Sequence, residues 1–372
     1  MLSQPPLWFI LVAFICAIGP LVFFHELGHY LVARWFGVGA EVFSIGFGRE
    51  ITGWTDKRGT RWKIGWLPLG GYVRFVGDMN PASMPAPGAD RDSRSFHHKP
   101  VWQRFLIVLA GPMANFLLAI LIFAAFFAAF GVPRSPSVVA EVQPGSAAEQ
   151  AGIQPGDRID SVAGRSIGSF EDLRRVVALR PGETVSIIVD RDGRFLRFQT
   201  ELAAREERDQ FGQSYRVGLL GVMPTGRVME RPPIHQLIPA AATYTVTLTR
   251  SMIDGLAQIV TGRRSAKDLG GPLKIAQIAG QQASLGFFEF VQLVALFSIN
   301  LGFINLLPVP MLDGGHLAFY AVEAVRRRPV SARAQEWAFR GGLAFLLALL
   351  FLVTFNDLGS FGLWDRLGRL IG

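Results

Sequence analysis

The sequence has little cysteine and little charge, and each shortage excludes a class of protein. Cys16 is the only cysteine among 372 residues, which excludes an intrachain disulfide and a cysteine-based zinc site. Charged residues make up 18% of the chain, below the roughly 25% usual for soluble domains, whereas 50% of the residues are hydrophobic. A disordered chain would be poorer in apolar residues. The composition therefore indicates a folded protein with an unusually large apolar part.

Lysine and arginine are absent from three long stretches, 1–33, 105–130 and 284–305. These stretches coincide with long apolar runs, and a shorter fourth run covers 343–355. A membrane-spanning helix needs about 20 mostly apolar residues. We therefore predict a multi-pass α-helical membrane protein with four transmembrane helices, which lie within 1–36, 101–132, 284–330 and 334–358 and precede a tail at 359–372.

The first apolar run could instead be a secretory signal peptide, which needs a basic N-terminal region and a small-residue cleavage site. No lysine or arginine precedes this run, and it leads directly into His25 and Glu26. We therefore expect a retained helix.

Basic residues near the ends of spans predict which side of the membrane a loop occupies. Eleven of them lie in 34–104, and four more lie between the third and fourth spans at positions 326, 327, 328 and 333. Both loops are expected in the cytoplasm, so the N-terminus and residues 131–283 should lie on the opposite side. The net charge of +8 is then mainly an orientation signal. We expect membrane lipid as a partner and no nucleic acid.

Residues 137–224 change in character and predict a small α+β domain outside the membrane. Short strand patterns alternate with turn residues, SFEDLRRVVAL has a helical period, and Asp192-Gly193 is typical of a hairpin. The stretch GSAAEQAGIQPGDRI resembles the loop of a PDZ domain with permuted strand order. A PDZ domain binds an extended peptide as an added strand, so a peptide ligand is expected. The alternative is a spacer domain of the same class.

Residues 225–283 form an amphipathic or linker region. Apolar residues recur at near-helical spacing there, which is compatible with a helix on the membrane surface and equally with packing against the spans.

The chemistry-bearing motif is HELGH at the end of the first span. His25 and His29 are four residues apart, so they share one face of a helix. In HExxH motifs the two imidazoles bind Zn²⁺ and the glutamate, here Glu26, acts as general base. The alternative is a structural helix with polar residues at its membrane end, but intramembrane histidine and glutamate are costly and usually functional.

A catalytic zinc needs a third protein ligand and one open position. His97 and His98 lie in a loop that is predicted to be solvated, and His235 is predicted on the far side of the membrane. Asp313, in NLLPVPMLDGGH after the third span, is predicted on the same side as the two histidines. Spacing alone does not separate a ligand from a turn or N-cap residue here. The prolines and glycines around it also make a regular helix unexpected.

Three features together resemble the site-2 protease family of intramembrane zinc metalloproteases, in particular the branch of the bacterial regulator of sigma-E protease. They are HELGH in the first span, NLLPVPMLDGGH at the third and a PDZ insert between spans two and three. GPMANF at 111–116 and LGGYV at 69–73 are also similar to family motifs. The best-known members carry two tandem PDZ domains, whereas only one fits here, so a role that needs a pair is not expected.

The resemblance implies Zn²⁺ bound by His25, His29 and Asp313, with Glu26 as catalytic base. It further implies that Asn305 holds the substrate or the developing oxyanion, although a helix-capping amide is the alternative. It implies cleavage of single-span membrane proteins such as an anti-sigma factor or remnant signal peptides. The location would be the bacterial inner membrane, with the PDZ domain in the periplasm and the active site toward the cytoplasm.

Residues 37–100 are predicted to hold a membrane-associated β-hairpin or sheet and a cytoplasmic loop. An unwound substrate could join an edge of this sheet as an extra strand, with Gly70, Gly71 and Tyr72 as substrate-binding residues. An amphipathic hairpin on the membrane surface is the alternative.

Two other classes of function compete with a protease. A membrane scaffold with a vestigial metal site would have lost at least one of the four zinc-site residues, yet all four are present. A transporter would be expected to show internal repeats, and none is visible.

Overall fold

The computed structural model describes residues 5–79, 92–208, 214–226, 228–261 and 270–360. The chain divides into two compact units, which we call the first unit (residues 1–125 and 238–372) and the second unit (residues 126–237). Most of the predicted tail lies outside the described residues.

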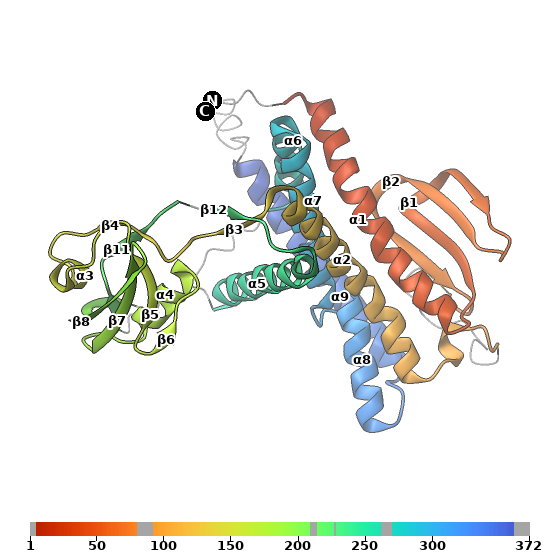
Figure 1. The fold of residues 1–372 in the computed structure, drawn as a ribbon. Helices are drawn as coiled ribbons and strands as arrows, with labels where there is room; N and C mark the ends of the chain where they lie inside the picture. The colour runs from red at the N-terminus through yellow and green to blue at the C-terminus, as the bar shows by residue number, and fades with distance from the viewer. Residues whose placement is uncertain (1–4, 80–91, 209–213, 227, 262–269, 361–372) are drawn as a thin grey trace, which may run out of the picture. The chain divides into compact units, whose positions relative to one another are not determined.

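Four helices are long and apolar enough to cross a membrane (Figure 1): α1 (Leu7–Trp35), α2 (Val101–Phe130), α7 (Phe287–Leu306) and α9 (Ala332–Ser360). Between 17% and 33% of the residues in their most apolar windows are buried, so most of this apolar surface is exposed. In water such a surface would be strongly unfavourable, whereas lipid accommodates it. The prediction of four candidate spans is confirmed over the described residues.

Helix α1 continues without a break through HELGH, because none of its residues removes helical hydrogen bonding after Pro20. Its buried positions recur every four residues, as expected for one face of a helix. Ala13 and Ala17 pack against Ala279 and Leu293 of the neighbouring helices. The same face continues to His25 and His29, so packing of the small residues fixes the orientation of the histidines.

The region 225–283, expected to be amphipathic or a linker, contains the helix α5 (Ile234–Val260) and most of α6 (Pro272–Leu285). Helix α6 contributes Ala279 to the cluster with α1, so packing against the spans is observed for this helix. Helix α5 contacts α2 through Tyr244 and Phe123, whose ring centroids are 4.9 Å apart.

Irregular backbone was expected on both sides of Asp313. This expectation is wrong for the residues from Asp313 onward. The chain is irregular after α7, where Met311 has φ of 82°, but α8 (Asp313–Arg326) begins at Asp313 and includes both glycines. A Cβ at Gly314 would lie 2.2 Å from the carbonyl oxygen of Leu307, and one at Gly315 would lie 2.5 Å from that of Val309. The glycines are therefore needed for close packing of the first helical turn on the preceding loop.

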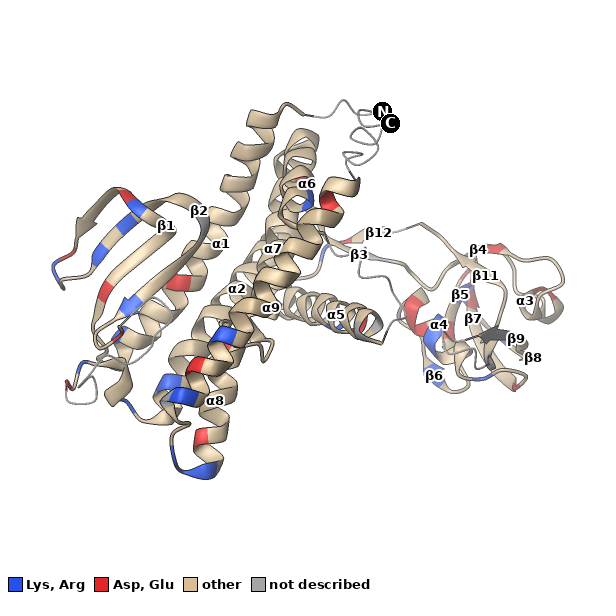
Figure 2. Cartoon of the chain, turned by 180° about the vertical axis from the view of Figure 1, so that it is seen from behind, with Lys and Arg blue, Asp and Glu red and all other residues tan. Residues whose placement is uncertain are grey.

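Two long strands, β1 (Ala40–Thr55) and β2 (Arg61–Phe75), form the predicted sheet in the first unit. Residues 40–45 pair with 71–75 on one side and with 61–64 on the other, and residues 50–55 pair with 61–65. Different parts of each strand therefore pair with different parts of the other strand. Residues 71–75 form an edge of the resulting sheet. Figure 2 shows several charged residues along this sheet, whereas α1 and α7 have few of them. A short 3₁₀ helix, η2 (Phe96–His98), precedes α2.

The second unit is an α+β fold with its own apolar core. A four-stranded sheet has the order β6-β5-β7-β8, and the remaining strands pair as β9 with β10, β4 with β11 and β3 with β12. The expected hairpin at Asp192-Gly193 is confirmed, since both residues have positive φ and Arg191 pairs with Arg194. The elements, in chain order, are β3 (Val132–Arg134), β4 (Val139–Val142), α3 (Ala147–Ala151), β5 (Arg158–Val162), β6 (Arg165–Ser166), α4 (Phe170–Ala178), β7 (Thr184–Arg191), β8 (Arg194–Glu201), β9 (Ala203–Arg208), β10 (Ser214–Leu219), β11 (Val222–Pro224) and β12 (Val228–Glu230).

Candidate active site

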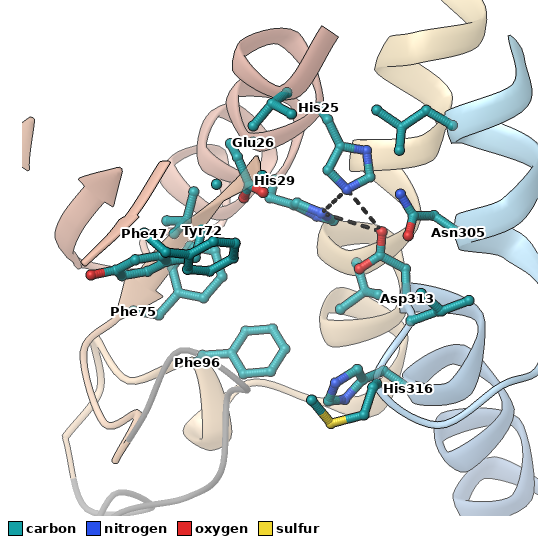
Figure 3. A pocket seen from close by; sticks show the side chains of 18 of the residues that line it. His25, Glu26, His29, Phe47, Tyr72, Phe75, Phe96, Asn305, Asp313 and His316 are labelled. Atoms are coloured by element: carbon teal, nitrogen blue, oxygen red, sulfur yellow. Dashed lines mark hydrogen bonds and ion pairs between the residues drawn. The ribbon is translucent and has the colours of Figure 1, made fainter. Parts of the chain in front are cut away.

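Three side chains that could hold a metal ion converge in the first unit (Figure 3). His25 and His29 come from successive turns of α1, and Asp313 is the first residue of α8. The Oδ2 atom of Asp313 lies 3.1 Å from Nε2 of His25 and 3.5 Å from Nε2 of His29. The two Nε2 atoms are 3.3 Å apart. The structure thus brings together the three residues that the sequence suggested as ligands.

The donor atoms of this cluster fit a bound cation. Nδ1 of His29 lies 2.9 Å from the carbonyl oxygen of Ile107, so Nδ1–H donates and Nε2 keeps its lone pair. No hydrogen bond reaches Oδ2 of Asp313, although this atom is buried. Lone pairs that face each other in a buried site repel unless a cation lies between them. Ligand bonds of about 2.0–2.2 Å around tetrahedral zinc place donor atoms about 3.3 Å apart, which matches the observed separations.

Glu26 lies beside the cluster without belonging to it. It is 8% exposed and directly follows His25 on α1, on the side that faces β2. The backbone of Val73 hydrogen-bonds to its carboxylate. A Cβ on Gly71 would lie 3.0 Å from Cγ of Glu26, so only glycine lets the edge strand approach this closely. Glu26 is therefore held between the metal-binding face of α1 and the edge of the sheet.

A cavity of ≈ 750 Å³ opens onto the cluster. It is lined by the remaining predicted site residues, Asn305 of α7 and Gly70, Gly71 and Tyr72 of β2. The ring of Tyr72 stacks on Phe47 with a centroid distance of 6.0 Å. The structure thus assembles all eight predicted site residues around one cavity.

Sequence reasoning missed other residues that line this cavity, among them His316 and Tyr320 of α8 and Phe96 of η2. Burial lowers the pKa of His316, which favours its neutral form at neutral pH. Its position three residues after Asp313, on the same face of a helix, was the available signal. Of the other histidines, His97 lies 2.9 Å from Asp78 and does not join the cluster.

Helix α2 supports the two histidines from behind, and this too was missed. Ile107, Gly111 and Asn115 follow each other at four-residue spacing, so they share one face. A Cβ on Gly111 would lie 2.2 Å from Nε2 of His29, and the amide nitrogen of Asn115 lies 3.2 Å from Nδ1 of His25. The motif GPMANF, which contains both residues, was the signal in the sequence.

Comparison with known proteins gives the same chemistry. The model of "Peptidase family M50" matches residues 13–349. A protein of Agrobacterium fabrum with the provisional name zinc metalloprotease Atu1380 is 44% identical over 360 residues, which cover 94% of this chain and 96% of that protein. Metalloprotease MmpA of Caulobacter vibrioides is 39% identical over 390 residues. The alignment covers 97% of this chain and 98% of the MmpA chain.

Among solved structures, the PDZ domain of the SdrC-like protein of Listeria monocytogenes covers 25% of this chain and 92% of its own, with 19% identity and a TM-score of 0.20. A similarity this weak supports no argument about the second unit.

Proposed function

The chain belongs to peptidase family M50 and is a zinc metalloprotease of the membrane, and we propose that it hydrolyses peptide bonds within or near the transmembrane segments of single-span proteins. The observation that carries this proposal is the position of the cluster. His25 and His29 lie on a helix that is itself apolar enough to span a membrane, so a substrate must reach the site from a membrane environment.

In this proposal His25, His29 and Asp313 hold the zinc, which when bound polarises water and the scissile carbonyl group. The Glu26 carboxylate accepts a proton from the attacking water and passes it to the nitrogen of the leaving amine. Burial of Glu26 beside the cluster, within reach of the Val73 backbone, keeps the carboxylate in one orientation for this transfer. The side-chain amide of Asn305, which lines the cavity, donates to the carbonyl oxygen on which negative charge develops.

The edge of β2 is the proposed binding surface for the substrate backbone. A transmembrane helix satisfies its own peptide groups, so a stretch must unwind before its bonds can be cleaved, and the exposed groups then need partners. Among the described residues, 71–75 pair with 40–45 and with no strand on their other side. Gly70, Gly71 and Tyr72 line the cavity. An unwound substrate segment would add to this edge as a further strand.

The test compares purified wild type with Glu26→Gln on a panel of single-span substrates, with and without a chelator. General base catalysis is worth about 10²- to 10⁴-fold, so we expect the variant to fall by that factor while it retains zinc. Cleavage by wild type should stop with chelator and return with added Zn²⁺. Undiminished cleavage by Glu26→Gln would contradict the mechanism, and cleavage of soluble peptides alone would contradict the substrate class.

For the second unit we propose a PDZ-like role outside the membrane, in which it binds peptide or excludes untrimmed substrates. The support is an α+β core with a β-hairpin and capped helices, together with the sequence motif. By family resemblance the substrates would be a trimmed anti-sigma factor or remnant signal peptides. Deletion of 137–224 should increase cleavage of an untrimmed substrate and leave a trimmed one unchanged. No increase would contradict the exclusion role.

We also propose the inner membrane of a bacterium, with the N-terminus and the second unit in the periplasm and the zinc site toward the cytoplasm. The basic residues of 34–104 and 326–333 support this orientation. Reporter fusions at the N-terminus and within 137–224 should both report the periplasm. A cytoplasmic signal from either would reverse the proposed orientation.

A further inference from the structure

The side chain of Asn115 is buried directly behind the cluster. It is 0% exposed, and its Nδ2 atom lies 3.2 Å from Nδ1 of His25. His25 directs its other ring nitrogen, Nε2, toward Asp313 and His29 at 3.1 and 3.3 Å. Asn115 therefore contacts the ring nitrogen of His25 that does not face the cluster.

The orientation of the amide conflicts with the chemistry of the ring. A histidine that binds metal through Nε2 carries its hydrogen on Nδ1. With Nδ2 of Asn115 facing Nδ1, two donors would meet, while the other amide atom, Oδ1, is buried and has no hydrogen-bond partner. Amide oxygen and nitrogen are assigned from the hydrogen bonds they make, because their positions are almost equivalent. Rotation of the amide by 180° places Oδ1 where it accepts Nδ1–H.

His29 shows the same arrangement with a different acceptor. Its Nδ1–H donates to the carbonyl oxygen of Ile107, two turns before Asn115 on α2. Each histidine on α1 would then have one oxygen of α2 on its Nδ1 atom. These two contacts require α1 and α2 to pack closely. Gly28 allows this, because a Cβ at that position would lie 2.4 Å from the carbonyl oxygen of Ala110.

We propose that Asn115 is a positioning residue for the metal site, whose Oδ1 atom accepts the Nδ1–H of His25 and thereby holds Nε2 toward the zinc. This inference rests on the proposed ligand set. The Asn115 backbone is fixed by α2 and also accepts a hydrogen bond from Ser298 Oγ of α7 at its carbonyl oxygen, at 2.8 Å. That bond involves no side-chain atom of Asn115, so the two roles can be separated experimentally.

The experiment measures zinc affinity of the full-length protein in detergent, by metal content after dialysis against graded concentrations of a chelator. Asn115→Leu keeps a similar volume but removes the acceptor. We expect zinc affinity to fall by about 10- to 100-fold, as for other outer hydrogen-bond partners of metal-bound histidine. Asn115→Asp supplies a carboxylate that only accepts hydrogen bonds, so it should restore affinity to the wild-type level or above.

Two controls separate the outcomes. Ser298→Ala removes the contact between α2 and α7 but not the amide, and it should leave zinc affinity unchanged. His25→Ala should lose zinc if the ligand set is correct, whatever happens at Asn115. Wild-type affinity in Asn115→Leu, or an equal loss in Asn115→Asp and Asn115→Leu, would overturn the positioning role. Retention of zinc by His25→Ala would instead overturn the ligand set.

Discussion

The first and second units both have apolar cores, but the first unit buries many more polar side chains. On α1, the buried face leads from Leu21 to His25, Glu26 and His29, while Leu11 on the same helix is 50% exposed. The second unit buries mainly apolar side chains, Ile187 among them, and few polar ones, such as Asp157. Lipid does not penalise exposed apolar surface, so a membrane unit can reserve its interior for polar groups. A domain in water depends on burying apolar surface and has fewer polar groups inside.

The stability of the two units therefore depends on different groups. The polar groups that the first unit buries need partners, and in the proposed ligand set a metal ion would supply those of His25, His29 and Asp313. Loss of one polar partner should therefore act on the zinc site, whereas loss of apolar volume should act on the second unit. Four substitutions or conditions test this difference.

The largest effect should come from Asp313→Asn, which removes a charged ligand from the polar interior. Loss of an outer partner already costs about 10- to 100-fold in metal affinity, so we expect a fall of more than about 100-fold here. Metal content after dialysis measures it. Asp357→Asn is the matched control, because Asp357 is also buried in the first unit but accepts hydrogen bonds from the first turn of α6 instead. Unchanged zinc content in Asp313→Asn would remove Asp313 from the ligand set.

The second unit should respond most strongly to Ile187→Ala. Ile187 is completely buried in β7, and such truncations cost about 2–5 kcal/mol through lost burial and a residual cavity. Hydrogen exchange of β7 and β8 in the full-length protein should accelerate, while zinc content stays constant. Phe195→Ala on β8 is the control, since Phe195 is 68% exposed and should change exchange little. Zinc loss in Ile187→Ala would contradict the expectation that loss of apolar volume affects the second unit and not the zinc site.

Gly111→Ala adds volume to the polar interior rather than removing a partner. Its Cβ would lie 2.2 Å from Nε2 of His29, so the ring or the helix must move, and overpacking of this kind costs about 1–3 kcal/mol. Both thermal stability and zinc affinity should fall. Gly19→Ala, on α1, meets no atom within 4 Å and should change neither property. Equal behaviour of the two variants would argue against close packing of α2 on His29.

The smallest effect should be a pH dependence in the second unit, at its one charged buried residue among those described, Asp157. Burial opposes ionisation, but hydrogen bonds from Arg191 and from the backbone of Gln154 outweigh it and lower the pKa of Asp157. A lowered pKa contributes stability above the unfolded value of about 3.9, and this contribution is lost as the pH falls through the folded value.

The free energy of opening of the second unit, taken from hydrogen exchange corrected for the intrinsic pH dependence of amide exchange, should therefore fall as the pH drops below about 4. Asp157→Asn should be less stable at pH 7 and should lose less on acidification. An identical acid response in wild type and Asp157→Asn would show that other carboxylates are responsible.

The structure also corrected or extended particular interpretations. Pro308, Pro310 and two glycines suggested irregular backbone throughout, yet α8 begins at Asp313 because Gly314 and Gly315 fit against the loop carbonyl groups. Residues 225–283 gave only a weak helical stripe and contain α5 and α6. Both differences arise because contacts between elements, which the local pattern does not contain, decide the outcome.

Features that depend on near neighbours in the chain could be predicted from the sequence. The length of the apolar runs predicted four spans, the four-residue spacing of HELGH placed two imidazoles on one helical face, and Asp192-Gly193 specified a hairpin. Each of these follows from helix periodicity, bilayer thickness or turn geometry. The family motifs named Asp313 as the third ligand, although spacing alone did not.

The groups that surround the histidines are set by the packing of helices that are distant in the sequence. Ile107 and Asn115 of α2 reach the Nδ1 atoms because Gly28 and Gly111 let two helices approach, and Asp313 arrives from α8 far along the chain. Helix packing distances and the choice of facing side chains are properties of whole surfaces, not of any one segment. For this reason the ligand pair was visible in the sequence, whereas the acceptors that orient it became visible only in the fold.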